Sequence, residues 1–288
     1  MLQVARLSPK LLGDSAPLVH GFLESQRSAN GGFIDRGGSS DLYYTVFGID
    51  SLIALRAEFP VEPLVAYLHS FGSGESLDLV HLACLARGWS AIPAALRAQA
   101  PVDRILAILE THRAADGGYH PSRGAERGTI YGCFLAWGAY QDLGHPMPQP
   151  ERIADCLAHL KAADGGYSNQ DDMPLGLTPP TAAAATLMRQ LGRPIEATTQ
   201  AWLLARCTAE GGFLAHPDAP LPDLLSTATA LHALVGMHAD LDPIAEPCLD
   251  FVDSLWTNRG SFYGHWGDDQ LDCEYTYYGL LALGHLSF

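Results

Sequence analysis

The chain has 288 residues, of which 48% are hydrophobic, and it carries 17 Lys and Arg against 32 Asp and Glu, a formal net charge of -15. This length can bury a large core, whereas the acidic balance argues against a nucleic-acid partner or an anionic membrane surface, because phosphate groups require a concentrated basic face. No run of about 18 apolar residues occurs, so we expect no membrane span.

A glycine-rich signature, Gly-Gly-aromatic, recurs along the chain. It begins at Gly31, Gly117, Gly165 and Gly211, with a weaker Gly260-Ser261-Phe262, and the starts are separated by 86, 48, 46 and 49 residues. The first gap is about twice the others, and a degenerate Gly-Ser-Gly copy lies near its middle, at 72–74. The pattern predicts six repeats of helix, glycine-rich loop and helix.

The helices of the six repeats fall into two sets. The first helices are expected near 15–29, 60–71, 101–114, 150–162, 195–208 and 243–257. The second helices are expected near 41–56, 77–88, 128–143, 179–191, 223–237 and 272–286. Because the second helices are apolar or small nearly all round, both of their faces must be covered. We therefore predict an all-α, (α/α)6 toroid, a single domain over residues 1–288, with the second helices inside.

The starts of the inner helices share a second pattern, Asp-x-x-(Tyr/His/Ser). It reads Asp41/Tyr44, Asp78/His81, Asp223/Ser226 and Asp272/Tyr275, with Gly128/Tyr131 and Thr178/Thr181 at the corresponding places. Asp is a preferred helix N-cap, so capping is one interpretation of the four aspartates. The first and last units match best, and in a closed ring they are neighbours.

No metal site or cofactor fingerprint accompanies the repeats. Six cysteines are scattered through apolar segments without a Cys-x-x-Cys pair or a preceding signal peptide: Cys84, Cys133, Cys156, Cys207, Cys248 and Cys273. We expect reduced thiols in a cytoplasmic protein. No His/Cys spacing matches a metal site and no phosphate-binding or dinucleotide motif is present, so we expect no bound metal and no cofactor.

The glycine loops and the closing segment 272–280 resemble the prenyltransferase/squalene-oxidase repeat superfamily, which includes protein prenyltransferase β-subunits and terpene cyclases. The resemblance covers essentially the whole chain and implies an α/α toroid around a hydrophobic, isoprenoid-type substrate. Protein prenyltransferases bind zinc through an Asp-x-Cys pair and a His. The matching places here hold Asp223, Leu225 and Tyr275, so two of the three ligands are missing. The Asp-x-Asp-Asp acid motif of squalene-type cyclases is also absent.

Three carboxylic acids near the junction of the first and last units are candidate catalytic acids: Asp41, Asp272 and Glu274. Crowded carboxylates in a partly apolar mouth raise one another's pKa, which keeps an acid protonated near neutral pH. The same region contains Asp268, Asp269 and Asp272 in an Asp-Asp-x-x-Asp arrangement, the Mg²⁺-chelating pattern of class I isoprenoid enzymes. Here the pattern straddles a loop and a helix start, so a solvated acidic loop is the alternative.

Aromatic and polar side chains near the inner helices are the candidate substrate contacts: Tyr44, Phe47, His81, Tyr131, Phe134, Trp266, Tyr275 and Tyr278. Aromatic walls suit an isoprenoid ligand and stabilise a carbocation, although plain core packing is the alternative. Units four and five present small side chains instead, at Thr181, Ala184, Ala185, Met188, Ser226, Thr229 and Ala233. This asymmetry predicts an off-centre apolar pocket.

These observations favour an enzyme that cyclises or isomerises a hydrophobic, isoprenoid-type small molecule by metal-independent acid-base chemistry. A non-catalytic toroid that binds a ligand or a protein partner is the first alternative. A divergent prenyltransferase is the second, and the resemblance leaves open whether a second subunit takes part.

Overall fold

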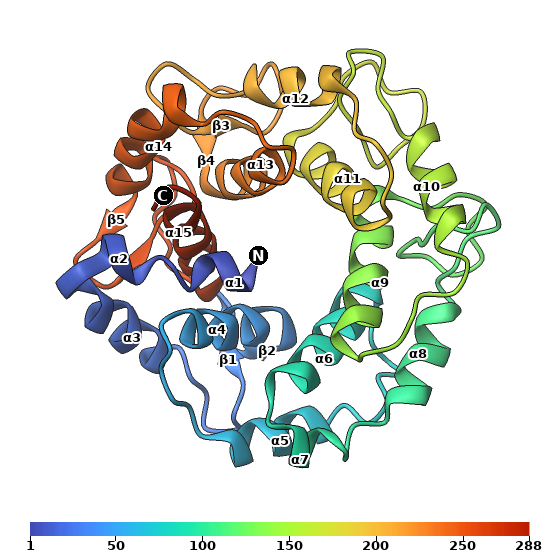
Figure 1. Ribbon diagram of the computed structural model, residues 1–288. Coiled ribbons are helices and arrows are strands. Elements are labelled where there is room, and N and C mark those ends of the chain that lie inside the picture. Colours follow the sequence, from blue (N-terminus) through green and yellow to red (C-terminus); the bar gives the residue numbers. More distant parts are fainter. Residues whose placement is uncertain (288) are drawn as a thin grey trace.

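The computed structural model describes residues 1–287, whose main helices form two concentric rings (Figure 1). Each helix of the inner ring has 13 residues: α4 (Leu42–Ala54), α6 (Leu79–Ala91), α9 (Ile130–Asp142), α11 (Thr178–Gln190), α13 (Leu224–Gly236) and α15 (Cys273–His285). The outer ring consists of α3 (Ala16–Ser25), α5 (Val61–His69), α8 (Val102–Glu110), α10 (Pro150–His159), α12 (Ala197–Leu204) and α14 (Asp242–Ser254). The predicted all-α toroid is confirmed, and α4 packs against α15 as expected of neighbouring units.

Several short elements were not expected from the sequence. Three antiparallel pairs of two-residue strands bridge loops: β1 (Phe33–Ile34) with β2 (Ser40–Asp41), β3 (Phe213–Leu214) with β4 (Pro222–Asp223), and β5 (Trp256–Thr257) with β6 (Ser261–Phe262). The short helices are α1 (Leu2–Ala5), α2 (Pro9–Leu12), the 3-10 turn η1 (Gly13–Ser15) and α7 (Ala94–Arg97). Helix α1 matters most for function, because it lies near the middle of the ring against α4 and α15 (Figure 1).

In three units the first glycine of the loop signature packs against the outer helix of the next repeat. Gly31, Gly211 and Gly260 have φ of +97°, +85° and +87°, in the left-handed region that favours glycine. A Cβ at these positions would lie 2.2, 1.9 and 2.1 Å from a backbone carbonyl oxygen of the following outer helix, those of Pro63, Pro247 and Leu18. Since Leu18 belongs to α3, the last of these contacts closes the ring.

The aromatic residue of the signature is tied to the inner helix of its own unit. The Phe33 N–H donates to Thr45 Oγ1 at 2.9 Å, and the Thr45 hydroxyl donates to the Asp41 carbonyl at 2.6 Å. The same N–H to threonine bond recurs at 2.8 and 2.9 Å in two further units, between Tyr167 and Thr181 and between Phe213 and Thr227. A buried backbone donor is thus satisfied in each of these loops.

The four aspartates of the second pattern are helix N-caps. The carboxylates of Asp41, Asp78, Asp223 and Asp272 each accept backbone N–H bonds from the first turn of their helix. In units three and four the predicted alignment was wrong by one residue, because the N-caps are Thr129 and Leu177. Gly128 belongs to the loop instead, where its N–H donates to Asp116. Tyr131 therefore corresponds to Tyr43 and not to Tyr44.

We predict that Gly211→Ala destabilises the fold by about 2 kcal/mol or more, because the new methyl group meets the Pro247 carbonyl as well as imposing left-handed strain. Gly192→Ala is the matched control, since Gly192 has φ +65° and a Cβ added there would meet no atom within 4 Å. It should cost only the strain, roughly 1 kcal/mol. Urea unfolding of both variants checks the difference, and equal losses would show that the contact between repeats contributes nothing.

Candidate functional site

The inner ring encloses a cavity of about 670 Å³, a size typical of small-molecule sites. Its lining residues follow the helical period, at the second, fifth, sixth and ninth places after an N-cap. In α4 these are Tyr43, Val46, Phe47 and Asp50. Because the ninth place lies roughly 10 Å further along the helix than the second, the cavity runs through the depth of the ring.

The two sides of the cavity differ in bulk, as the sequence predicts. Aromatic side chains from α4, α9 and α15 form one wall: Tyr43, Phe47, Tyr131, Phe134, Trp137, Tyr277 and Tyr278. Small side chains from α11 and α13 form the other: Ala182, Ala183, Thr186 and Thr229. Of the small residues named from the sequence, only Thr229 lies in the lining. The faces of α11 and α13 are rotated from those expected, and Thr181 instead bonds the loop of its unit.

Four of the predicted substrate contacts line the cavity, namely Phe47, Tyr131, Phe134 and Tyr278. The other four do not belong to its lining: Tyr44, His81, Trp266 and Tyr275. Three of these stand at the third place after an N-cap, one step away from the inward-facing position. Trp266 lies in a loop, 52% exposed, and its indole N–H donates to Ser254.

The two candidate acids that cap helices are engaged in ion pairs at the mouth of the cavity. Asp272 is 1% exposed and accepts from the Tyr275 N–H at 2.8 Å and from Arg36 Nε at 2.6 Å. Asp41 accepts from its own helix, and its Oδ2 lies 3.0 Å from His81 Nε2. These carboxylates hold the side chains of Arg36 and His81, and the first turns of α4 and α15, in place.

The acidic run before α15 is organised around a basic side chain. Arg36 lies 2.8 Å from Asp268 as well as 2.6 Å from Asp272, so it bridges two of the three carboxylates in the Asp-Asp-x-x-Asp pattern. Across residues 1–287, no three His, Cys, Asp or Glu side chains are grouped as metal ligands. The positions suggested for zinc by the resemblance hold Asp223, Leu225 and Tyr275, which do not fit zinc because they supply neither thiolate nor imidazole.

Glu274 differs from the other two candidate acids. It stands at the second place after its N-cap, as Tyr43, Tyr131 and Leu225 do, but unlike these three it does not belong to the cavity lining and meets the cavity through Tyr43. The Tyr43 hydroxyl donates to Glu274 Oε1 at 2.6 Å. Burial raises the pKa of Glu274, the charge of Asp272 raises it too, and the hydrogen bond from Tyr43 lowers it. The resulting pKa is about 7. Close to neutral pH, Glu274 is therefore protonated in a large fraction of molecules.

The opposite end of the cavity contains a cluster of charges that sequence reasoning missed. Arg87 Nε and Nη2 donate to Asp50 Oδ2 at 3.0 and 2.7 Å, and Nη1 donates to Asp142 Oδ1 at 3.0 Å. We call these three residues the floor triad. Burial raises the pKa of both aspartates, against the lowering effect of Arg87. The available signal was the presence of lone charged residues in otherwise apolar inner helices.

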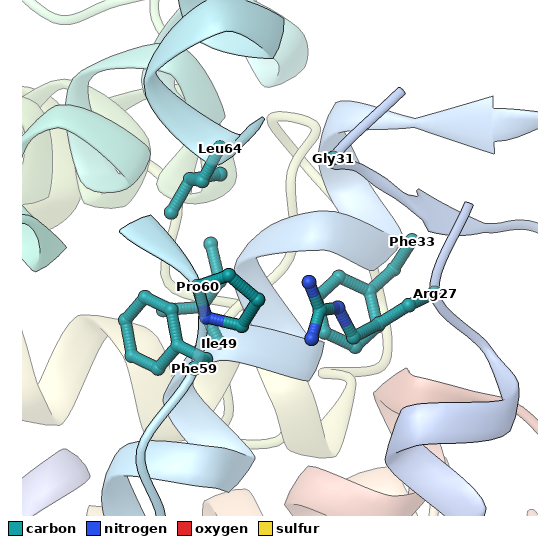
Figure 2. Close-up of a pocket in the computed structure, with 7 residues that line it drawn as sticks. All are labelled: Arg27, Gly31, Phe33, Ile49, Phe59, Pro60 and Leu64. Atoms are coloured by element: carbon teal, nitrogen blue, oxygen red, sulfur yellow. The ribbon is translucent and has the colours of Figure 1, made fainter. Parts of the chain in front are cut away.

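A second pocket lies in the outer part of the ring, between the first two units (Figure 2). Its lining includes Phe33, Ile49 and Leu64, and its volume is about 10 Å³. Because this is about the volume that a single water molecule needs, the pocket is too small for a substrate. The central cavity is the candidate site. No helix within residues 1–287 combines the length and apolar character that crossing a membrane requires.

Comparisons with known proteins agree on the architecture. A family model described as the prenyltransferase alpha-alpha toroid domain matches residues 7–82, 80–213 and 159–287. No curated protein sequence matches the chain at a significant level.

Three solved structures illustrate the range of proteins with this fold. A type II terpene cyclase from Scytonema, in complex with geranylgeranyl dihydroxybenzoate, is 13% identical with a TM-score of 0.64 over 97% of each chain. Protein geranylgeranyltransferase-I of Candida albicans, complexed with GGPP, is 14% identical with a TM-score of 0.73, over 94% of this chain and 90% of that chain. A polysaccharide lyase is 12% identical with a TM-score of 0.61 over 97% of each chain. At these identities the likeness shows the fold alone.

The raised pKa of Glu274 predicts how stability depends on pH. Its folded-state pKa of about 7 lies above the ordinary 4.5, so its ionisation opposes folding as pH rises from about 4.5 to above 7. Glu274→Gln should therefore be more stable than the wild type at pH 8, by at most about 3 kcal/mol, with a smaller advantage near pH 4.

Glu110→Gln is the control of opposite sign. Although burial raises the Glu110 pKa, hydrogen bonds from Arg113, Tyr119 and Tyr140 lower it below the ordinary value overall. This variant should lose stability at pH 8. Denaturant unfolding across the pH range measures both effects, and an unchanged pH dependence in Glu274→Gln would contradict the raised pKa.

Proposed function

The chain belongs to the prenyltransferase alpha-alpha toroid family, and on that premise we propose that it is an enzyme that protonates a hydrophobic, isoprenoid-type substrate inside the ring. The result is a cyclisation or an isomerisation that needs no metal. The observation that carries this proposal is the hydrogen bond between Glu274 and Tyr43, a residue that lines the aromatic cavity.

The proposed acid step transfers one proton from Glu274 to a carbon-carbon double bond. The O–H bond of the neutral carboxyl breaks as a new C–H bond forms, and the adjacent carbon becomes a carbocation. Faces of Phe47, Tyr131 and Tyr278 surround the path of the substrate and stabilise positive charge through their ring quadrupoles. The ionised Glu274 then keeps the hydrogen bond from Tyr43 and takes back a proton when the product forms.

The charges around the cavity favour a neutral substrate over a prenyl diphosphate. A diphosphate needs cations that are not already neutralised. Arg36 at the mouth lies between Asp268 and Asp272, and Arg87 at the other end lies between Asp50 and Asp142. This arrangement supports proton-initiated chemistry rather than diphosphate departure, and it gives the prenyltransferase alternative little support.

In this proposal Asp41 and Asp272 are positioning residues. Asp272 fixes the first turn of α15, which carries Glu274, and its negative charge helps to raise the pKa of Glu274. Asp41 fixes the first turn of α4, which carries Tyr43. Both carboxylates thus hold the acid and its hydrogen-bond donor at the same level of adjacent helices.

Glu274→Gln should lower turnover of a neutral polyprenyl substrate by about 10²- to 10⁴-fold while ligand binding changes little, because the amide retains the shape but cannot donate the proton. Product analysis by mass spectrometry after incubation with neutral polyprenyl compounds measures the loss. Glu62→Gln, on outer helix α5, is the control. Binding without turnover in the wild type, unaffected by Glu274→Gln, would support the non-catalytic alternative instead.

Tyr43→Phe tests the hydrogen bond to the acid. Since the Tyr43 hydroxyl stabilises the ionised form of Glu274, its loss should raise the Glu274 pKa. The alkaline limb of the pH-rate profile should therefore move to higher pH than in the wild type. If the alkaline limb stays in place or moves to lower pH, the group that titrates in this limb is not Glu274 in its hydrogen bond with Tyr43.

A further inference from the structure

The cavity lining contains a polar group without a partner. Tyr277 is 3% exposed and lines the cavity. Among the residues that the structure describes, no atom forms a hydrogen bond with its hydroxyl. An unpaired buried hydroxyl costs free energy, so a ligand group that bonds to it recovers that cost.

The floor triad interacts electrostatically with the hydroxyl of Tyr277. Asp50, Arg87 and Asp142 are the charged groups that act on the pKa of Tyr277, which burial already raises. All three line the same cavity, and Arg87 and Asp142 keep side-chain exposures of 32% and 17%. Arg87 has five N–H bonds, and its hydrogen bonds to the two aspartates use three of them.

The net charge at this end limits what it can bind. One guanidinium and two carboxylates sum to one negative charge, and burial makes an added anion unfavourable. Burial lowers the pKa of the Met1 amino group to about 6, so this group adds little positive charge at neutral pH. His232 lines the cavity on the other side, 3.1 Å from His285 through Nδ1. Burial lowers the pKa of His232 to about 2, so it adds no positive charge at neutral pH.

Helix α1 covers this end of the cavity. Met1, Leu2 and Gln3 belong to the lining, and Met1 lies near enough to Asp50 to affect its pKa. Of the two carboxylates in the triad, Asp142 is therefore the more accessible to a ligand in the cavity. A ligand group here meets a hydrogen-bond acceptor in Asp142 and, in Tyr277 and Arg87, groups that can donate to it.

We propose that this end of the cavity is a subsite for an uncharged hydroxyl group, carried by the substrate at the end remote from the double bond that Glu274 protonates. The inference rests on the proposed function for the position of the reacting bond. A hydroxyl both donates and accepts, so it donates to Asp142 and accepts from Tyr277. A carboxylate or a diphosphate meets the net negative charge, and an ether cannot donate to Asp142.

The test compares four ligands with one hydrocarbon chain: farnesol, farnesyl methyl ether, farnesoate and farnesyl diphosphate. Isothermal titration calorimetry on the wild-type chain should give farnesol an affinity at least about tenfold above that of the other three. Equal or tighter binding of the ether, the carboxylate or the diphosphate overturns the proposal. This comparison needs no variant, so it does not depend on how a substitution affects folding.

Two variants then test whether the preference for farnesol depends on the Tyr277 hydroxyl. Tyr277→Phe should reduce the affinity for farnesol about tenfold and that for the methyl ether by a smaller factor, because the ether lacks the bond to Asp142 that holds its oxygen beside Tyr277. A purely structural hydroxyl would leave both affinities unchanged. Tyr67→Phe is the matched control, because it removes another buried tyrosine hydroxyl, on outer helix α5 and away from the cavity lining. An equal loss of farnesol preference in both variants overturns the assignment to Tyr277.

Glu274→Gln separates this inference from the proposed function. It should leave the preference for farnesol intact while abolishing turnover. If turnover is lost but the wild type binds alcohol and ether equally, the subsite is wrong and the acid stands. If the preference holds but Glu274→Gln retains full turnover, the acid is wrong and the subsite remains.

Discussion

The contact between a glycine and a backbone carbonyl of the next outer helix is the constraint on which the toroid depends. Gly31, Gly211 and Gly260 approach their neighbours so closely that even a methyl group does not fit. At these three joins the approach restrains the angle between successive repeats, and one of the three is the join at which the ring closes. The inner helices that follow these loops, and the cavity between them, depend on that angle.

Because the inner helices are arranged in a ring, the few positions on each helix that face inward together form a site with two ends. The second place after five of the N-caps lines the cavity near its mouth, where Tyr43 bonds to Glu274, and the ninth place faces the floor, where Asp50 and Arg87 stand. Aromatic side chains fill the space between these polar ends. A long apolar ligand with one polar terminus matches this distribution better than a compact polar one.

The repeat and the fold were predictable from the sequence because both depend on local chemistry. Glycine pairs, Asp caps and apolar helices leave signatures within a few residues. The site was less predictable, since the direction of a side chain changes by about 100° for each residue along a helix. An error of one place assigned Tyr131 to the level of Tyr44 rather than Tyr43. The contact among the three residues of the floor triad could not be predicted from the sequence. Three helices contribute one charged residue each, and only the ring brings them together.

Gly260 packs on Leu18, which lies near the other end of the chain. The seam between the last and first units is made by the same type of contact as the joins at Gly31 and Gly211. The contact is nevertheless the least local of all, and the entropy of bringing distant residues together opposes it until the intervening hairpins are ordered. Closure of the seam is therefore expected late in folding. In the finished ring, the chain could therefore begin and end at a different join between units and still form the same arrangement of helices.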